Sequence, residues 1–237
     1  MPGTYKRVLL KLSGEILAGG EGFGLHYPTI HDISTEIAEV ARNGVQIAMV
    51  VGGGNFIRGV QAVDQGMERV QADQMGMLAT VINGLALQNA LESAGVPTRV
   101  QTAIEMRSIA EPFIRRRAIR HLEKGRIVIF AAGTGSPYFS TDTAAALRAS
   151  EIDADCLLKA TKVNGIYDKD PNRFPDARYI PELHFMDALQ MQLKVMDAAA
   201  FSLCMENRMP LVVFDVQKKG NLAKLLLAGE RIGSIVS

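Results

Sequence analysis

Three consecutive glycines, Gly52, Gly53 and Gly54, are the residues whose type and spacing first suggest chemistry. They follow an apolar run over 45–51 that is rich in valine, a pattern typical of a buried parallel strand. Because glycine has no Cβ, N–H groups at such a strand end can face an anion, phosphate above all. A tight turn from strand to helix explains the pattern equally well, so the glycines alone leave both interpretations open.

Two basic residues stand where a phosphate could bind. Lys11 lies at the C-terminal end of the apolar run 7–12, and ligands of open α/β sheets gather outside such strand ends. Arg58 follows the glycines within about one helical turn, and its planar guanidinium suits phosphate oxygens. Either side chain could instead simply be solvated.

A second loop rich in glycine and hydroxyl groups favours the phosphate interpretation. Residues 132–143 follow the predicted strand 126–131 and lead into a predicted helix over 144–149, which Ser140 or Thr141 could cap. The N-terminus of that helix would face the same sheet edge as the first glycine loop. Two such loops in one sheet indicate two anionic groups to hold.

Three further residues could hold a nucleoside. Asp73 precedes a predicted helix over 75–93, and its carboxylate could cap that helix or accept hydrogen bonds from sugar hydroxyls. In the turn-rich segment 163–171, Tyr167 offers a stacking face and Asp170 an acceptor for adenine. A plain surface loop fits the same segment.

Composition excludes several classes of protein. Of the 237 residues 48% are hydrophobic and only 6% aromatic, which favours the aliphatic core of an α/β protein. The net charge of +1 gives no sign of nucleic-acid or membrane binding. Two cysteines and four histidines form neither a disulfide framework nor a metal-ligand spacing. Neither a signal peptide nor a membrane span is predicted, so we expect a cytoplasmic protein.

Motif searches narrow the chemistry further. The sequence contains no P-loop, no G-x-G-x-x-G and none of the serine-hydrolase, zinc-protease or protein-kinase signatures. What remains is a set of glycine-rich strand ends with separate basic residues, namely Lys11, Arg58, Lys159 and Lys162. This combination suits phosphoryl transfer, which needs positioning and charge neutralisation more than a covalent nucleophile.

Strands and helices alternate along the chain, as expected of one α/β domain. The predicted strands are 7–12, 45–51, 98–102, 126–131, 155–160, 211–214 and 231–236. The predicted helices are 30–41, 75–93, 111–124, 144–149, 189–206 and 221–227.

Six short motifs together resemble the bacterial UMP kinases of the amino-acid kinase superfamily. They are Leu9-Leu10-Lys11-Leu12-Ser13-Gly14-Glu15, Gly52-Gly53-Gly54-Asn55, Asp73-Gln74-Met75-Gly76-Met77, Gly133-Thr134-Gly135, Thr141-Asp142 and Lys159-Ala160-Thr161-Lys162. The resemblance covers essentially the whole chain. It implies a single domain, a three-layer αβα sandwich with a central, mostly parallel sheet. Residues 1–150 would form an acceptor-nucleotide lobe and 151–237 an ATP lobe.

The resemblance also implies roles for individual residues. With Mg-ATP as donor and UMP as acceptor, Lys11 would bridge the phosphates, Asp197 would orient Lys11, and Arg58 would offset charge. The implied ATP-binding residues are Lys11, Leu12, Ser13, Gly14, Gly54, Arg58, Lys159, Thr161, Lys162, Tyr167 and Asp170. The implied UMP-binding residues are Gly53, Asp73, Thr134, Gly135, Ser136, Pro137, Tyr138, Phe139, Ser140 and Thr141. Asp142 is a weak candidate ligand of Mg²⁺, and the reaction would be direct in-line transfer without a general base.

Regulation is implied as well, in the form of a homohexamer that GTP activates and UTP inhibits. The residues that match the GTP response are Gly19, Gly20, Glu21, Gly22, Phe23, Gly24, Arg99 and Arg126. The sequence departs from the family pattern at Asn164, where many relatives carry aspartate.

Three other functions remain open at this point. A kinase for a carboxylate or carbamate would share the fold, but such an acceptor offers no ribose or uracil for Asp73 and the loop 134–141 to hold. Intact Lys11 and Asp197 argue against an ATP-binding storage or sensor protein. The arginines over 115–120 could contact nucleic acid, but near-neutral charge favours a solvated face or a subunit contact.

Overall fold

The computed structural model describes residues 5–237, apart from the side chains of residues 59–61. Residues 1–4, part of the N-terminal stretch expected to lack a signal peptide, lie outside the described residues. None of the helices in the described chain combines the length and the apolar character needed to span a bilayer.

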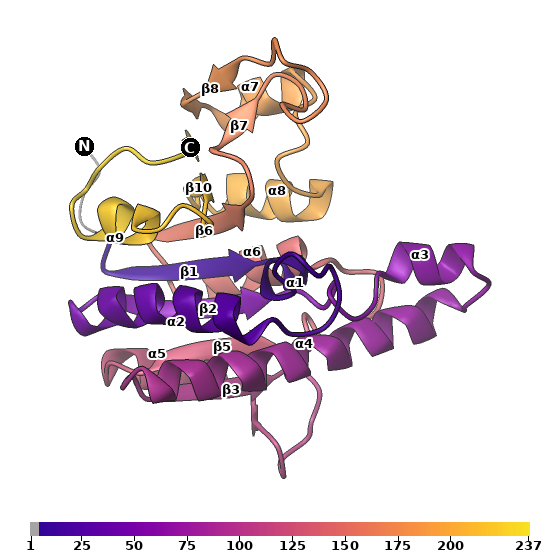
Figure 1. The fold of residues 1–237 in the computed structure, drawn as a ribbon, viewed down its shortest axis with the longest axis vertical. Coiled ribbons are helices and arrows are strands. Elements are labelled where there is room, and N and C mark those ends of the chain that lie inside the picture. The colour runs from indigo at the N-terminus through magenta and orange to yellow at the C-terminus, as the bar shows by residue number, and fades with distance from the viewer. Residues whose placement is uncertain (1–4) are drawn as a thin grey trace.

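A nine-stranded sheet forms the centre of the described chain, in the order β4-β3-β5-β2-β1-β6-β10-β11-β9 (Figure 1). Its strands are β1 (Arg7–Leu12), β2 (Gln46–Val51), β3 (Thr98–Thr102), β4 (Glu111–Pro112), β5 (Ile127–Ala131), β6 (Cys156–Thr161), β9 (Glu182–Leu183), β10 (Leu211–Asp215) and β11 (Ser234–Val236). All pairings from β4 to β10 are parallel, and β11 alone pairs antiparallel with β10. A separate antiparallel pair is formed by β7 (Ile166–Tyr167) and β8 (Tyr179–Ile180). The predicted mostly parallel sheet is therefore confirmed.

Helices cover both faces of this sheet. One face carries α2 (Tyr27–Arg42), α4 (Arg69–Ser93) and α9 (Asn221–Leu226), and the other α5 (Arg115–Glu123), α6 (Thr141–Glu151), α7 (Phe185–Gln190) and α8 (Ala198–Glu206). Because side chains alternate along a strand, Val8, Leu10 and Leu12 of β1 pack in the first core while Leu9 packs in the second. The three-layer αβα sandwich is confirmed.

The centre of the sheet is a topological switch point. Strands β2, β5 and β3 lie in that order on one side of β1. Strands β6 and β10, which come later in the chain, lie on the other side. Ligands of such sheets bind outside the carboxyl ends of the strands. The short helices α1 (Gly14–Leu17) and α3 (Gly59–Asp64) lie at that end, and the first turns of α4 extend beyond it (Figure 1).

Several predicted boundaries were wrong. The helix expected over 75–93 begins earlier, at Arg69. Its start was not predicted because the first turns of the helix show no apolar periodicity. Asp73 therefore lies in the second turn, and Glu68 holds the N-cap position. The expected helix 111–124 begins only at Arg115, since Glu111 and Pro112 pair with β3.

Two further elements are shorter than expected. The predicted helix 189–206 is broken: α7 ends at Gln190, Gln192 has φ +54°, and α8 begins after Asp197. The predicted strand 231–236 starts at Ser234, following Gly233 with φ +82°.

Candidate active site

Two lysines share one carboxylate at the carboxyl edge of the sheet. Lys11 and Lys159 are register partners on the adjacent strands β1 and β6. Asp142, in the first turn of α6, places Oδ1 2.9 Å from Lys11 Nζ and Oδ2 2.7 Å from Lys159 Nζ. Lys159 Nζ also donates to the carbonyl oxygen of Val195 at 2.6 Å. We call Lys11, Asp142 and Lys159 the charged centre.

Burial and charge act against each other in the charged centre. Burial alone would raise the pKa of Asp142, but the ammonium groups of Lys11 and Lys159 outweigh it and hold that pKa below its ordinary value. Burial lowers the pKa of Lys159, and the Asp142 carboxylate opposes this only in part. Two cations around one anion leave a net positive charge, which is what a transferring phosphoryl group requires.

Asp197 contacts hydroxyl groups instead of Lys11. Its carboxylate caps α8 by accepting from the N–H of Ala200 at 3.0 Å. It also accepts from the hydroxyls of Ser140 and of Thr143, the latter at 3.1 Å. Asp197 thus ties the start of α8 to the start of α6. The carboxylate in contact with Lys11 is Asp142, which differs from the sequence expectation, and a role of Asp197 in orienting Lys11 stays a prediction.

Ser140 holds the N-cap position of α6. Its hydroxyl accepts from the N–H of Thr143 at 3.1 Å. Of the two cap candidates, Ser140 is therefore the one used, and α6 begins with Thr141, three residues before the predicted start.

Gly14 and Gly53 pack so closely against their neighbours that neither position has room for a side chain. A Cβ on Gly14 would lie 2.6 Å from the carbonyl oxygen of Gly52 and 2.8 Å from the nitrogen of Gly54. A Cβ on Gly53 would lie 2.5 Å from the carbonyl oxygen of Gly76 in α4. In the described chain the N–H groups of Gly53 and Gly54 form no hydrogen bond. They are therefore available to an anion.

Two buried asparagines hold the glycine loop, and sequence reasoning missed one of them. Asn83 of α4 donates to the carbonyl oxygen of Gly52 at 2.7 Å and to Oδ1 of Asn55 at 2.7 Å. Asn55 in turn donates to Asn83 Oδ1 at 2.9 Å and to the carbonyl oxygen of Gly24 at 2.7 Å. The available signal was an amide within the mostly apolar run 77–87 of α4. Arg58, nearby, pairs with Glu15 at 2.7 Å with both side chains partly exposed.

The structure brings Asp73 together with the loop 134–141. Asp73 Oδ2 accepts from the N–H of Tyr138 at 2.8 Å and from Nε of Arg69 at 2.8 Å. The guanidinium of Arg69 lies over the Tyr138 ring, 5.5 Å from its centroid. Arg69 is a second residue that sequence reasoning missed, because it lies in the polar first turn of α4.

A cavity of about 450 Å³ lies beside the charged centre on the β6 side. Of the expected ATP-binding residues it is lined by Lys159, Thr161, Tyr167 and Asp170, and sequence reasoning missed Lys194 and Val195 in its wall. Tyr167 packs edge-on against Tyr179 at 5.6 Å.

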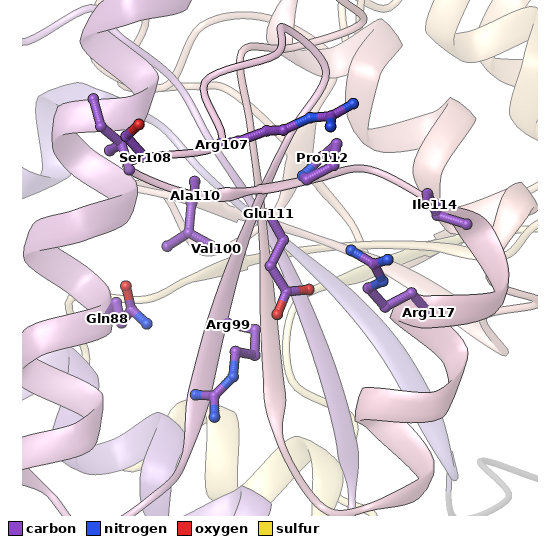
Figure 2. Close-up of a pocket in the computed structure, with 11 residues that line it drawn as sticks. Gln88, Arg99, Val100, Arg107, Ser108, Ala110, Glu111, Pro112, Ile114 and Arg117 are labelled. Carbon is purple, nitrogen blue, oxygen red and sulfur yellow. The ribbon is translucent and has the colours of Figure 1, made fainter.

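A second cavity, of about 620 Å³, lies near the edge strand β4 and its neighbour β3 (Figure 2). Three arginines, Arg99, Arg107 and Arg117, line it together with Glu111. Figure 2 shows the carboxylate of Glu111 between Arg99 and Arg117.

The residues matched to the GTP response do not form one cluster. Arg99 lines the second cavity, whereas Arg126 lies 3.1 Å from Nδ1 of His121. The loop 19–24 contacts the glycine loop instead, with the N–H of Gly24 donating to the carbonyl oxygen of Asn55 at 2.9 Å. Phe23 packs on Phe56 at 5.9 Å.

Comparison with known proteins identifies the fold and the family of this chain. The sequence model of the amino acid kinase family matches residues 6–215. The UMP kinase of Bacillus anthracis is 37% identical, with a TM-score of 0.95 over 99% of this chain and 97% of its own. The UMP kinase of Ureaplasma parvum is 38% identical, with a TM-score of 0.92 over 98% of each chain. The uridylate kinase of Archaeoglobus fulgidus is 26% identical, with a TM-score of 0.73 over 97% of this chain and 99% of its own.

The family match spans most of the chain, and near-full-length similarity to two UMP kinases narrows the assignment further. The chain therefore belongs to the amino acid kinase family, within the group of the UMP kinases.

Proposed function

We propose that this chain transfers the γ-phosphoryl group of ATP to UMP, giving UDP and ADP. The observation that carries the proposal is the charged centre: two cations held by one carboxylate, between the free N–H groups of the glycine loop and the cavity on the β6 side. A site of this kind neutralises phosphate charge and positions two phosphates, which is most of what phosphoryl transfer needs.

The reaction proceeds in line. A phosphate oxygen of UMP attacks the γ-phosphorus, the bond to the β–γ bridging oxygen breaks, and its electron pair leaves with ADP. Lys11 and Lys159 offset charge on the transferring group, and Arg58 does so from the rim of the site. The acceptor oxygen is already ionised at neutral pH, so no general base is needed. Burial raises the pKa of both thiols, Cys156 and Cys204, to about 12, which suits neither to nucleophilic catalysis.

The two nucleotides occupy opposite sides of the charged centre. ATP takes the cavity lined by Thr161, Tyr167 and Asp170, within a donor lobe over 151–237. UMP takes the side of Gly53, Asp73 and the loop 134–141, within an acceptor lobe over 1–150. The contact of Asp73 with Tyr138 supports this second assignment, because it joins both parts of the acceptor side.

Mg²⁺ enters as part of the Mg-ATP substrate. The described residues contain no group of three potential ligands among histidine, cysteine, aspartate and glutamate. Asp142, the weak candidate, already has both oxygens against lysines. We therefore assign the ion mainly to the ATP phosphates, in keeping with the few carboxylates that Mg²⁺ uses at nucleotide sites.

Regulation and assembly form the outer part of the proposal. The three arginines of the second cavity suit a triphosphate effector, GTP as activator or UTP as inhibitor. Met75, Leu78 and Ile82 form an exposed apolar stripe on α4, which supports a subunit contact within a homohexamer. The enzyme would serve pyrimidine nucleotide biosynthesis in the cytoplasm.

The test is ADP production from Mg-ATP with a panel of acceptors: UMP, CMP, dTMP, AMP, GMP, acetylglutamate, aspartate and carbamate. We expect turnover with UMP far above that with any other acceptor. Turnover with a small acid would leave the fold assignment unchanged and would show that UMP is not the acceptor. ATP binding without any turnover would favour a storage or sensor protein.

A further inference from the structure

Asp73 uses only one of its two carboxylate oxygens within the described chain. Oδ2 accepts both from Nε of Arg69 and from the N–H of Tyr138, each at 2.8 Å. Oδ1 forms no hydrogen bond with any described residue. The side chain is only 15% exposed, so rotating it would break two contacts that water replaces poorly. The carboxylate is therefore fixed with Oδ1 as its available oxygen.

Tyr138 is held in an unfavourable position. Its φ is +70°, in the left-handed region that residues with a Cβ rarely adopt, and the residue is 67% exposed. A strained and exposed residue persists only where neighbouring contacts keep it there. The contacts present are its N–H bond to Asp73 and the guanidinium of Arg69 over its ring.

These contacts close a triangle between two elements. Arg69 contacts the carboxylate of Asp73 and the ring of Tyr138, and Asp73 contacts the backbone of Tyr138. The loop has independent anchors on both sides, since the N–H of Gly135 donates to Ala132 at 2.9 Å and Ser140 caps α6. The triangle is therefore not what folds the loop.

We propose that Arg69 and Tyr138 form a latch that positions Asp73 for the ribose of the acceptor nucleotide. The inference rests on the proposed function, because it presupposes a nucleotide acceptor beside Asp73. Arg69 and Tyr138 are positioning residues: they fix the rotamer of Asp73, and Oδ1 then accepts from a ribose hydroxyl. Their effect should fall on acceptor binding and leave the transfer step unchanged.

The test is a kinetic comparison of Arg69→Met and Tyr138→Ala with one matched control. Arg120→Met removes an arginine from another helical pair, Arg120–Glu123, which is exposed and lies on α5. We expect Arg69→Met and Tyr138→Ala each to raise the KM for UMP about fivefold. A change of this size is what the loss of an exposed cation–π contact and the weakening of an exposed ion pair would produce. The turnover number and the KM for ATP of both variants, and all kinetic constants of Arg120→Met, should stay within about twofold of wild type, the spread expected when no contact of consequence is lost.

The double variant sharpens the test. Because both residues act through Asp73, Arg69→Met with Tyr138→Ala should raise the KM for UMP less than the product of the single effects. An unchanged KM for UMP in Arg69→Met overturns the latch. Equal rises in the KM for UMP and for ATP, with a lower melting temperature, show a structural role and also overturn it. A wild-type chain inactive with UMP overturns the proposed function and the latch together, whereas active wild type with unaffected variants overturns the latch alone.

Discussion

The charged centre and the latch contain polar contacts of nearly equal length in different surroundings. In the charged centre the Lys11, Asp142 and Lys159 side chains are 11%, 14% and 16% exposed, with contacts of 2.7–2.9 Å. In the latch the Arg69 side chain is 42% exposed, and its contact with Asp73 is 2.8 Å. Removing one partner of a buried ion pair costs about 3–5 kcal/mol, whereas an exposed pair contributes about 0–1 kcal/mol. Burial, more than distance, should therefore determine how much free energy each contact contributes.

This comparison assigns different kinetic roles to the two regions. The charged centre faces the transferring phosphoryl group, so changes there should lower turnover and stability. The latch faces the sugar of the acceptor, so changes there should affect the KM for UMP. Single substitutions in each region test that division.

The largest effect is expected from Lys11→Met. Loss of a cation aimed at developing charge typically lowers turnover about 10²–10³-fold. Steady-state assays with saturating ATP and UMP measure it, and thermal unfolding checks that the variant folds. Lys124→Met, on the exposed end of α5, is the matched control and should retain normal turnover. Near-normal turnover in Lys11→Met would remove this lysine from the mechanism.

Asp142→Asn should have the largest effect on stability. It removes the carboxylate that Lys11 and Lys159 share and leaves the two lysines buried side by side, which should lower the free energy of unfolding by about 3 kcal/mol. Urea unfolding at neutral pH measures the loss. Asp197→Asn is the informative comparison, because the amide oxygen still accepts from the Ala200 N–H and from the Thr143 hydroxyl.

The pair of variants also settles which aspartate orients Lys11. We expect turnover to fall more in Asp142→Asn than in Asp197→Asn. If turnover instead falls more in Asp197→Asn, and Asp142→Asn is stable and active, Asp197 is the residue that orients Lys11. That result would also show that burial of a contact does not determine the cost of removing it.

Asp73→Ala tests the acceptor side directly. A hydrogen bond to a charged group contributes about 1.5–3 kcal/mol, so the KM for UMP should rise about tenfold or more, with the KM for ATP little changed. Turnover at saturating UMP should fall far less than in Lys11→Met. Equal losses for both nucleotides would mean that Asp73 only organises the loop 134–141.

Stability should fall in acid, in part because of Asp142. Its pKa in the folded chain lies below the ordinary value of 3.8, so near that pH the unfolded chain binds more protons. The stabilisation is fully present above the ordinary value and is lost as the pH falls through the folded value. The pKa of Glu111 is also lowered: burial would raise it, but hydrogen bonds from Gln101 and His121 outweigh that, and its contribution has the same sign.

Urea unfolding between pH 6 and pH 3 measures this dependence. Wild type should lose more stability than Asp142→Asn over that range, because only wild type carries the carboxylate whose pKa is lowered in the folded chain. Parallel curves for the two proteins would show that Asp142 does not titrate differently in the folded chain.

Local patterns in the sequence were enough for the longer strands, whereas the two-residue strands β4, β7, β8 and β9 were not predicted. Apolar runs located β1, β3 and β6 within a residue or so, because a buried strand is marked by its own side chains. The charged centre required more. Asp142 meets its lysines only because the β1–β6 register aligns Lys11 with Lys159, and no local pattern contains that register. Asn83 was missed for the same reason, since its partners Gly52 and Asn55 lie outside its helix.

The smallest effect is expected from Glu15→Gln, which removes the ion pair with Arg58. That pair has the same 2.7 Å separation as Lys159 and Asp142, but its side chains are 41% and 48% exposed. Water screens both charges already, so the free energy of unfolding should change by less than about 0.5 kcal/mol. The measurement is urea unfolding beside Asp142→Asn under identical conditions. A loss in Glu15→Gln as large as that in Asp142→Asn would show that separation, and not burial, sets the strength of these pairs.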